Sequence, residues 1–186
     1  MMSRRQGRDK LAGGWASTWR HVAQRRGRAA KQEMPMHALL TTVVLWLSAN
    51  FGLPANHDHP LLKFVPERKI VELRYKGLAA WEPQTGAVPA GLPGQRLTVS
   101  VYDDVTKTIY LPEGWTGDTP ADLSILVHEM VHHLQNVGKL KFECPQEREQ
   151  LAYKAQEKWL GMFGRDLLRD FEIDGFTLLV STKCMY

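Results

Sequence analysis

Two histidines and a glutamate that could perform metal chemistry, His128, Glu129 and His132, lie close together in the segment SILVHEMVHHLQ. The histidines are four residues apart, so a helix with 3.6 residues per turn places both imidazoles on one face. Such a pair can bind one metal ion and leave positions open for a third ligand and a water molecule. Glu129 points off that axis, where it can act on the water as a general base. The spacing therefore predicts a metal site with a general base beside it.

The sequence around this motif predicts a buried helix from about Pro120 to Val137. Its boundaries are marked by an N-cap residue, a first-turn proline, a capping-box acid and a terminating glycine: Thr119, Pro120, Asp122 and Gly138. Apolar side chains cover much of its circumference, which is typical of a core helix. The alternative is an ordinary helix that carries two solvated or hydrogen-bonded histidines. The capped, apolar context favours the metal site.

A third metal ligand is expected on the next helix, which should begin near Cys144 or Pro145 and continue to about Phe163. Three acidic residues near its start are alternatives: Glu143, Glu147 and Glu149. Helix geometry places Glu149 on one face with Ala152, whose small side chain would let the two helices approach closely.

At these residues the chain resembles the zincin metallopeptidases, and more narrowly the gluzincins, whose third zinc ligand is a glutamate on the following helix. The resemblance covers His128 to His132 and the segment EQLAY, Glu149 to Tyr153, and extends to small uncharacterised bacterial proteins of this class. It implies one Zn²⁺ per chain, held by His128, His132 and Glu149, and a peptide or protein substrate. It also implies an α+β minimal zincin fold, in which a small antiparallel or mixed sheet has an edge strand beside the active-site helix. A helical C-terminal part follows.

The resemblance further implies peptide-bond hydrolysis by a metal-activated water, with Glu129 as the general base. Zinc and a nearby hydrogen-bond donor would stabilise the oxyanion, and Tyr153, His133 and Tyr110 are candidates for that donor. Many relatives carry an aspartate at the place of Tyr153, for which a packing role is the alternative. His133 lies about 100° around the helix from His132, which argues against ligation. A zinc-binding but catalytically idle module that captures a peptide or partner protein is the alternative function, although a base at Glu129 favours the enzyme.

A β-hairpin is expected between Arg96 and Leu111, where two runs rich in Val, Ile, Thr and Tyr flank the turn sequence DDVTK. Its second strand is expected to be an exposed edge strand that binds an extended peptide by strand addition. The substrate-binding residues would then be Thr108, Ile109, Tyr110 and Leu111. The alternative is a hairpin that only packs on the helices.

The other elements are short. A strand is expected at Leu61–Val65, a helix at Pro66–Gly77 and a Gly- and Pro-rich loop at Glu82–Gln95. Short helices around Leu167 and Leu168, and from Phe176 to Val180, are expected to close the core.

The charge distribution separates an N-terminal arm from the body of the chain. Of 186 residues, 44% are hydrophobic and 24% are charged, which suits one globular domain. Residues 1–35 carry nine basic and two acidic side chains, so the net charge of +4 leaves −3 for residues 36–186. We therefore expect a disordered basic arm at 1–35, and a single domain at 36–186 that binds no nucleic acid through its folded body.

The apolar run from His37 to Ala55 bears on localisation. Its helical spacing and its stop residues, Gly52 and Pro54, favour an amphipathic core helix and a cytoplasmic protein. A cleaved signal segment is the alternative and would mean export to the periplasm or secretion. The run is too short to span a membrane. Cys144 and Cys184 permit either one disulfide, which favours an oxidising compartment, or two buried thiols.

Overall fold

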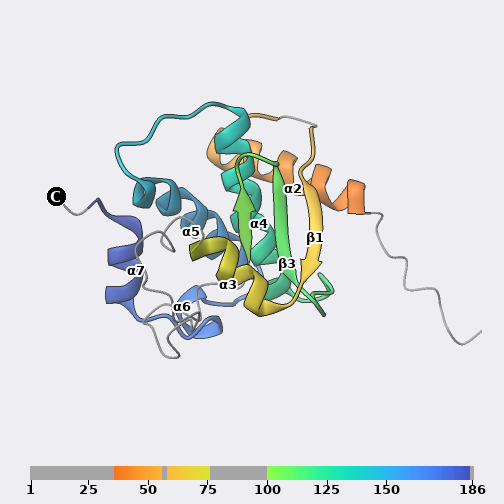
Figure 1. Cartoon of the computed structure of the whole chain (residues 1–186). Helices are drawn as coiled ribbons and strands as arrows, with labels where there is room; N and C mark the ends of the chain where they lie inside the picture. Colours follow the sequence, from red (N-terminus) through yellow and green to blue (C-terminus); the bar gives the residue numbers. More distant parts are fainter. Residues whose placement is uncertain (1–35, 56–57, 76–99, 185–186) are drawn as a thin grey trace, which may run out of the picture. The chain divides into compact units, whose positions relative to one another are not determined.

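The computed structural model describes residues 36–55, 58–75 and 100–184, which belong to one compact unit that begins at Met36. Its elements, in chain order, are α2 (Met36–Phe51), β1 (Leu61–Val65), α3 (Glu67–Tyr75), β2 (Val101–Asp103), β3 (Thr108–Pro112), α4 (Pro120–Val137), α5 (Pro145–Gly161), α6 (Leu167–Asp170) and α7 (Gly175–Thr182) (Figure 1). The fold is therefore α+β with a helical C-terminal part, as the sequence predicts. The expected arm at 1–35 and the loop at 82–95 lie outside the described residues.

The three strands form a small mixed sheet in the order β1-β3-β2 (Figure 1). Strand β1 is parallel to β3, while β2 is antiparallel to it and pairs Tyr102 with Ile109. The predicted hairpin is confirmed for β2 and β3, because the Asp103 carboxylate accepts the backbone N–H groups of Val105 and Thr106 and so closes the turn.

The prediction that Thr108–Leu111 forms an exposed edge is wrong. Strand β3 lies in the centre of the sheet, with β1 hydrogen-bonded on one side and β2 on the other. Thr108, Ile109 and Leu111 are fully buried, and Tyr110 is half-buried. Its backbone groups are used within the sheet, so this strand cannot add a substrate strand. Among the described residues, the edges are β1 and β2.

Helix α4 is the central element of the core. It begins as the sequence predicts, because the Thr119 side chain accepts the backbone N–H of Asp122. Every residue from Ser124 to Gln135 is buried. The neighbours that cover it include the sheet, α2 and α5. This packing fixes the orientation of any functional side chain on α4.

Helix α2 has the predicted amphipathic pattern. The side chains that it buries are Leu40, Val43, Val44 and Leu47, and all four belong to the core that includes α4. In the part of the chain that the structure describes, no helix is long and apolar enough to cross a membrane.

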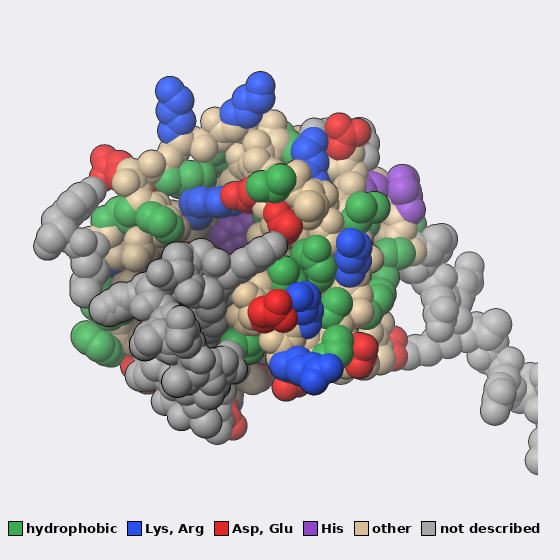
Figure 2. Space-filling model, viewed as in Figure 1, with side chains coloured by type: hydrophobic (Ala, Val, Ile, Leu, Met, Phe, Trp, Pro, Cys, Tyr) green, Lys and Arg blue, Asp and Glu red, His purple; other side chains and the backbone are tan. Residues whose placement is uncertain are grey.

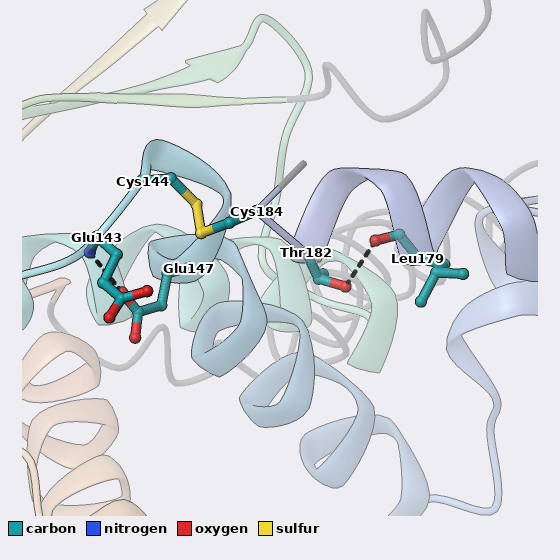
Figure 3. The surroundings of a disulfide bond; sticks show 6 residues. All are labelled: Glu143, Cys144, Glu147, Leu179, Thr182 and Cys184. Carbon is teal, nitrogen blue, oxygen red and sulfur yellow. Dashed lines mark hydrogen bonds between the residues drawn. A yellow bond between two sulfur atoms is a disulfide. The ribbon is translucent and has the colours of Figure 1, made fainter. Parts of the chain in front are cut away.

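Helix α5 packs closely on α4, with Ala152 fully buried. Cys144, the N-cap residue of α5, forms a disulfide with Cys184, which follows α7 (Figure 3). Of the two alternatives for the cysteines, the structure thus contains the disulfide, and it connects the start of α5 with the end of the C-terminal helices.

Candidate metal centre

Three side chains from two helices bring potential ligand atoms together. His128 and His132 lie one turn apart on α4, and Glu149 lies in the second turn of α5. The two Nε2 atoms are 3.2 Å apart. The Glu149 carboxylate lies 3.1 Å from His128 Nε2 and 3.4 Å from His132 Nε2. All three ligand atoms lie within 4.8 Å of one another, a grouping that could hold a metal ion.

These distances fit the dimensions of a zinc site. A tetrahedral zinc ion with bonds of about 2.0–2.1 Å to nitrogen and oxygen separates its ligand atoms by about 3.3 Å. Here the two nitrogens are 3.2 Å apart, Glu149 Oε2 lies 3.1 Å from His128 Nε2, and Glu149 Oε1 lies 3.4 Å from His132 Nε2. Two imidazoles and one carboxylate are also a common donor set for zinc. The residues present therefore fit a zinc ion in both spacing and chemistry.

Two glutamine side chains set the tautomers of the histidines. Gln135 Nε2 donates to the carbonyl oxygen of Arg148, so Gln135 Oε1 faces His132 Nδ1 at 3.1 Å. In the same way Gln156 Nε2 donates to Ser124 Oγ, and Gln156 Oε1 faces His128 Nδ1 at 3.1 Å.

An amide oxygen can only accept, so each Nδ1 carries the proton and donates it. In the neutral rings, the Nε2 atoms of His128 and His132 are then the ones that can bind a metal ion, beside the Glu149 carboxylate. A proton or a cation between these atoms and the carboxylate relieves the repulsion between their lone pairs.

The pKa values of His132 and Glu149 are both shifted in the direction that brings positive charge into the site. Burial lowers the pKa of His132, but the charge and hydrogen bond of Glu149 outweigh it and raise the pKa above its ordinary value. Burial raises the pKa of the Glu149 carboxyl, yet His132 and His128 outweigh it and hold that pKa far below its usual range. Glu149 is therefore a carboxylate at neutral pH, and it attracts positive charge into the site.

Glu129 is held beside this centre by a residue that the sequence did not single out. Ser100 Oγ, immediately before β2, donates to Glu129 Oε1 at 2.6 Å, and both side chains are buried. Glu129 lines the same cavity as His132 and Glu149. No local sequence pattern indicates Ser100, because the contact joins residues 29 positions apart.

His133 has a separate structural role. Tyr102 Oη lies 3.1 Å from its Nδ1, and the carbonyl oxygen of Asp58 lies 2.6 Å from its Nε2. Asn136 donates to Tyr102 Oη and to the carbonyl oxygen of Asp104. With both ring nitrogens occupied, His133 is not a ligand, and it anchors the β2–β3 hairpin on α4.

The other candidates for ligands and oxyanion donors lie apart from the centre. The carboxylate of Glu147 accepts the backbone N–H of Glu143 at the start of α5, where Figure 3 shows both near the disulfide. The grouping that could hold a metal contains neither of them. Tyr110 lies on β3 with its ring beneath Lys63.

Tyr153 packs directly on a candidate ligand. Its ring meets the His128 ring edge to face, with the centroids 4.7 Å apart. Burial is the main cause that raises its pKa, so the hydroxyl keeps its proton at neutral pH. Tyr153 also lines a separate cavity of about 480 Å³ between α5, α6 and α7. This second cavity has none of the three potential ligands in its wall, so it is not the candidate site.

The cavity at the candidate centre has a volume of about 340 Å³. Its wall is formed by residues of α3, β2, α4 and α5, with Pro145 at the start of α5: Leu73, Arg74, Val101, Tyr102, Glu129, His132, Pro145, Arg148 and Glu149. Figure 2 shows histidine atoms recessed in a hollow on one face of the molecule, beside acidic and basic side chains. Within the part of the chain that the structure describes, this volume would admit a small molecule or part of a peptide.

Fold and site together define a small α+β domain with a His–His–Glu grouping, of which His132 and Glu149 line a cavity. The chain belongs to the family described as "Domain of unknown function (DUF6647)", whose sequence pattern it matches over residues 32–186. No curated protein and no solved structure matches the chain significantly. The family description names no activity, so the function must be inferred from the site.

Proposed function

We propose that the protein is a zinc-dependent metallopeptidase of the gluzincin type. The observation that carries the proposal is the convergence of His128 Nε2, His132 Nε2 and the Glu149 carboxylate. The two nitrogens are 3.2 Å apart, and one carboxylate oxygen lies 3.1 Å from His128 Nε2 while the other lies 3.4 Å from His132 Nε2. A buried carboxylate, Glu129, borders the same cavity without belonging to this grouping. Two imidazoles, one carboxylate and a separate general base are the parts that metal-assisted peptide hydrolysis requires.

The residue roles follow from their positions. A zinc ion in this site would act as a Lewis acid, making a water molecule more acidic and polarising the peptide carbonyl. Glu129 accepts the proton of the attacking water and later gives it to the leaving amine. Ser100 holds Glu129 Oε1 by a hydrogen bond, which leaves Oε2 to exchange the proton. Tyr153 remains the proposed donor to the oxyanion because it contacts the His128 ring and its hydroxyl can donate a hydrogen bond, although it lines the other cavity and not the one that Glu129 lines.

The strand that borders the cavity offers a way to bind a peptide. Val101 and Tyr102 of β2 line the cavity, and among the described residues β2 has a strand partner only in β3. Its outer backbone groups are therefore the place where an extended substrate would add as a strand. This role moves from β3, where the sequence had suggested it, to β2.

The test is metal analysis combined with a peptide digest. Protein purified without chelators should contain one zinc per chain and cleave members of a diverse peptide library, as followed by mass spectrometry. Glu129→Gln should keep the zinc and lose at least about a hundredfold in hydrolysis rate. Glu113→Gln, at an exposed turn, is the matched control and should behave as the parent.

Two results would contradict the proposal. Protein that binds no zinc would remove the metal site altogether. Zinc-loaded protein that cleaves no peptide would instead support the alternative, a catalytically idle module that binds zinc and captures a peptide or partner protein.

A further inference from the structure

The wall of the candidate cavity carries positive charge next to the metal centre. Apart from Glu129, His132 and Glu149, it is formed by four apolar or aromatic side chains and two arginines: Leu73, Val101, Tyr102, Pro145, Arg74 and Arg148. Lysine and aspartate are absent from this described lining. Apart from the reaction centre, the two arginines are therefore the charged side chains of the described cavity wall.

Arg148 is already paired. Its Nη1 and Nη2 atoms bind the two carboxylate oxygens of Asp104 at 2.7 and 2.9 Å, which joins the β2–β3 turn to α5. Such a two-point pair holds the guanidinium in one geometry and cancels most of its charge. Arg148 therefore stabilises the cavity wall and contributes little net charge to it.

Arg74 is available to a ligand. It lies in the last turn of α3 and is exposed, and within the described segments no hydrogen bond or ion pair involves its guanidinium. Arg74 lines the same cavity as His132 and Glu149. Its guanidinium is thus placed to meet a ligand that reaches the centre.

A bound metal ion would leave the charge of Arg74 as the net charge of the cavity. The two carboxylates of the cavity, Glu129 and Glu149, would repel an anionic substrate, but a divalent cation offsets both of them. With Arg148 paired to Asp104, the charge of Arg74 then remains as the excess charge of the cavity. A guanidinium pairs preferentially with planar anions such as carboxylates, through two parallel hydrogen bonds.

We propose that this cavity selects ligands that carry a carboxylate close to the scissile peptide bond, and that Arg74 binds that carboxylate. The proposal rests on the proposed function, because it names the substrate class of the same site. The carboxylate could belong to an acidic side chain of a longer peptide or to a free C-terminus. Both sources offer the same chemistry to Arg74, and the experiment distinguishes them.

The experiment uses paired peptides and two readouts with the full chain. One set replaces Glu by Gln at each position near the cleaved bond, and the other compares a free C-terminal acid with its amide. Hydrolysis by the zinc-loaded parent is measured as kcat/KM. Binding of the same peptides to zinc-loaded Glu129→Gln protein is measured by fluorescence anisotropy, which needs no catalysis.

The parent should prefer one of the two acidic sets about fivefold in both readouts, and the preference should shrink as salt is added. In Arg74→Ala the ratio between peptides with and without the carboxylate should fall to about one. Peptides without the carboxylate should be bound and cleaved as they are by the parent. Arg68→Ala is the matched control, because Arg68 is an exposed arginine of the same helix outside the cavity wall. It should leave the preference unchanged.

The outcomes separate this proposal from the proposed function. Binding that prefers carboxylates and depends on Arg74, without hydrolysis, would support the ligand class and refute the peptidase. Hydrolysis without any acidic preference, or with a preference that survives Arg74→Ala, would refute the ligand class alone. Absence of both binding and hydrolysis would overturn both.

Discussion

Replacing Gln156 by leucine should weaken zinc binding although Gln156 is not a ligand. The change removes the acceptor of the His128 Nδ1–H bond, which measures 3.1 Å and is buried. It leaves the ligand atoms of His128, His132 and Glu149 in place. The effect on affinity therefore reports on the hydrogen bond that sets the tautomer of His128.

The magnitude follows from comparing the bound and free states. With zinc bound, Nε2 of His128 would be committed to the metal and the proton would stay on Nδ1, and without Gln156 this buried N–H would have no acceptor. That loss costs about 1–3 kcal/mol. In the metal-free state the ring can carry its proton on Nε2 instead, 3.1 Å from the Glu149 carboxylate. Since the cost falls on the bound state alone, the zinc Kd should rise about 5- to 150-fold.

The assay is competition for zinc against a chromophoric chelator, with urea denaturation of the metal-free protein as the check on folding. Gln150→Leu is the control, because Gln150 lies on the same helix and lines the other cavity. Gln156→Glu, which keeps an acceptor, should bind zinc as tightly as the parent does. Folded Gln156→Leu protein with the parental Kd would refute the argument from the tautomer.

Three further changes test other parts of the site and fold. Glu149→Gln should remove stoichiometric zinc, as measured by native mass spectrometry, whereas Glu147→Gln should retain it; the reverse result would reassign the third ligand. Ser100→Ala should keep zinc but lower kcat about tenfold, because Glu129 loses a buried hydrogen bond, and Ser100→Thr should restore the rate; equal rates in all three proteins would exclude a role for Ser100. Replacing Cys144 and Cys184 by serine should lower the free energy of unfolding in urea by about 4 kcal/mol, since the disulfide closes a loop with a sequence separation of 40; an unchanged midpoint would contradict this.

The boundaries of the helices could be predicted because helix termini depend on local chemistry. The Thr119 cap and the following Pro120 specify the start of α4 through neighbouring residues only. The position of a strand within the sheet depends on distant pairing instead. Nothing near Thr108 in the sequence indicates that Leu61 will pair with it, and that parallel pairing moves β3 from the edge to the centre.

The two histidines could be found from spacing alone, because both lie on one helix. The sequence left Glu149 among three alternatives, since their separation from the histidines depends on how α4 and α5 pack. Gln135 could have been noticed, because it follows His132 by three residues on the same helix and is therefore within reach. The contact of Ser100 with Glu129 had no such local indication.

The continuous burial of Ser124 to Gln135 in α4 determines where local unfolding of the domain can begin. Because every residue from Ser124 to Gln135 is covered, the amide hydrogens of this stretch can exchange with solvent only when the surrounding layers separate. The histidines thus belong to the segment expected to open last. A thermal fluctuation that frees the cavity rim therefore leaves both imidazoles in their folded positions.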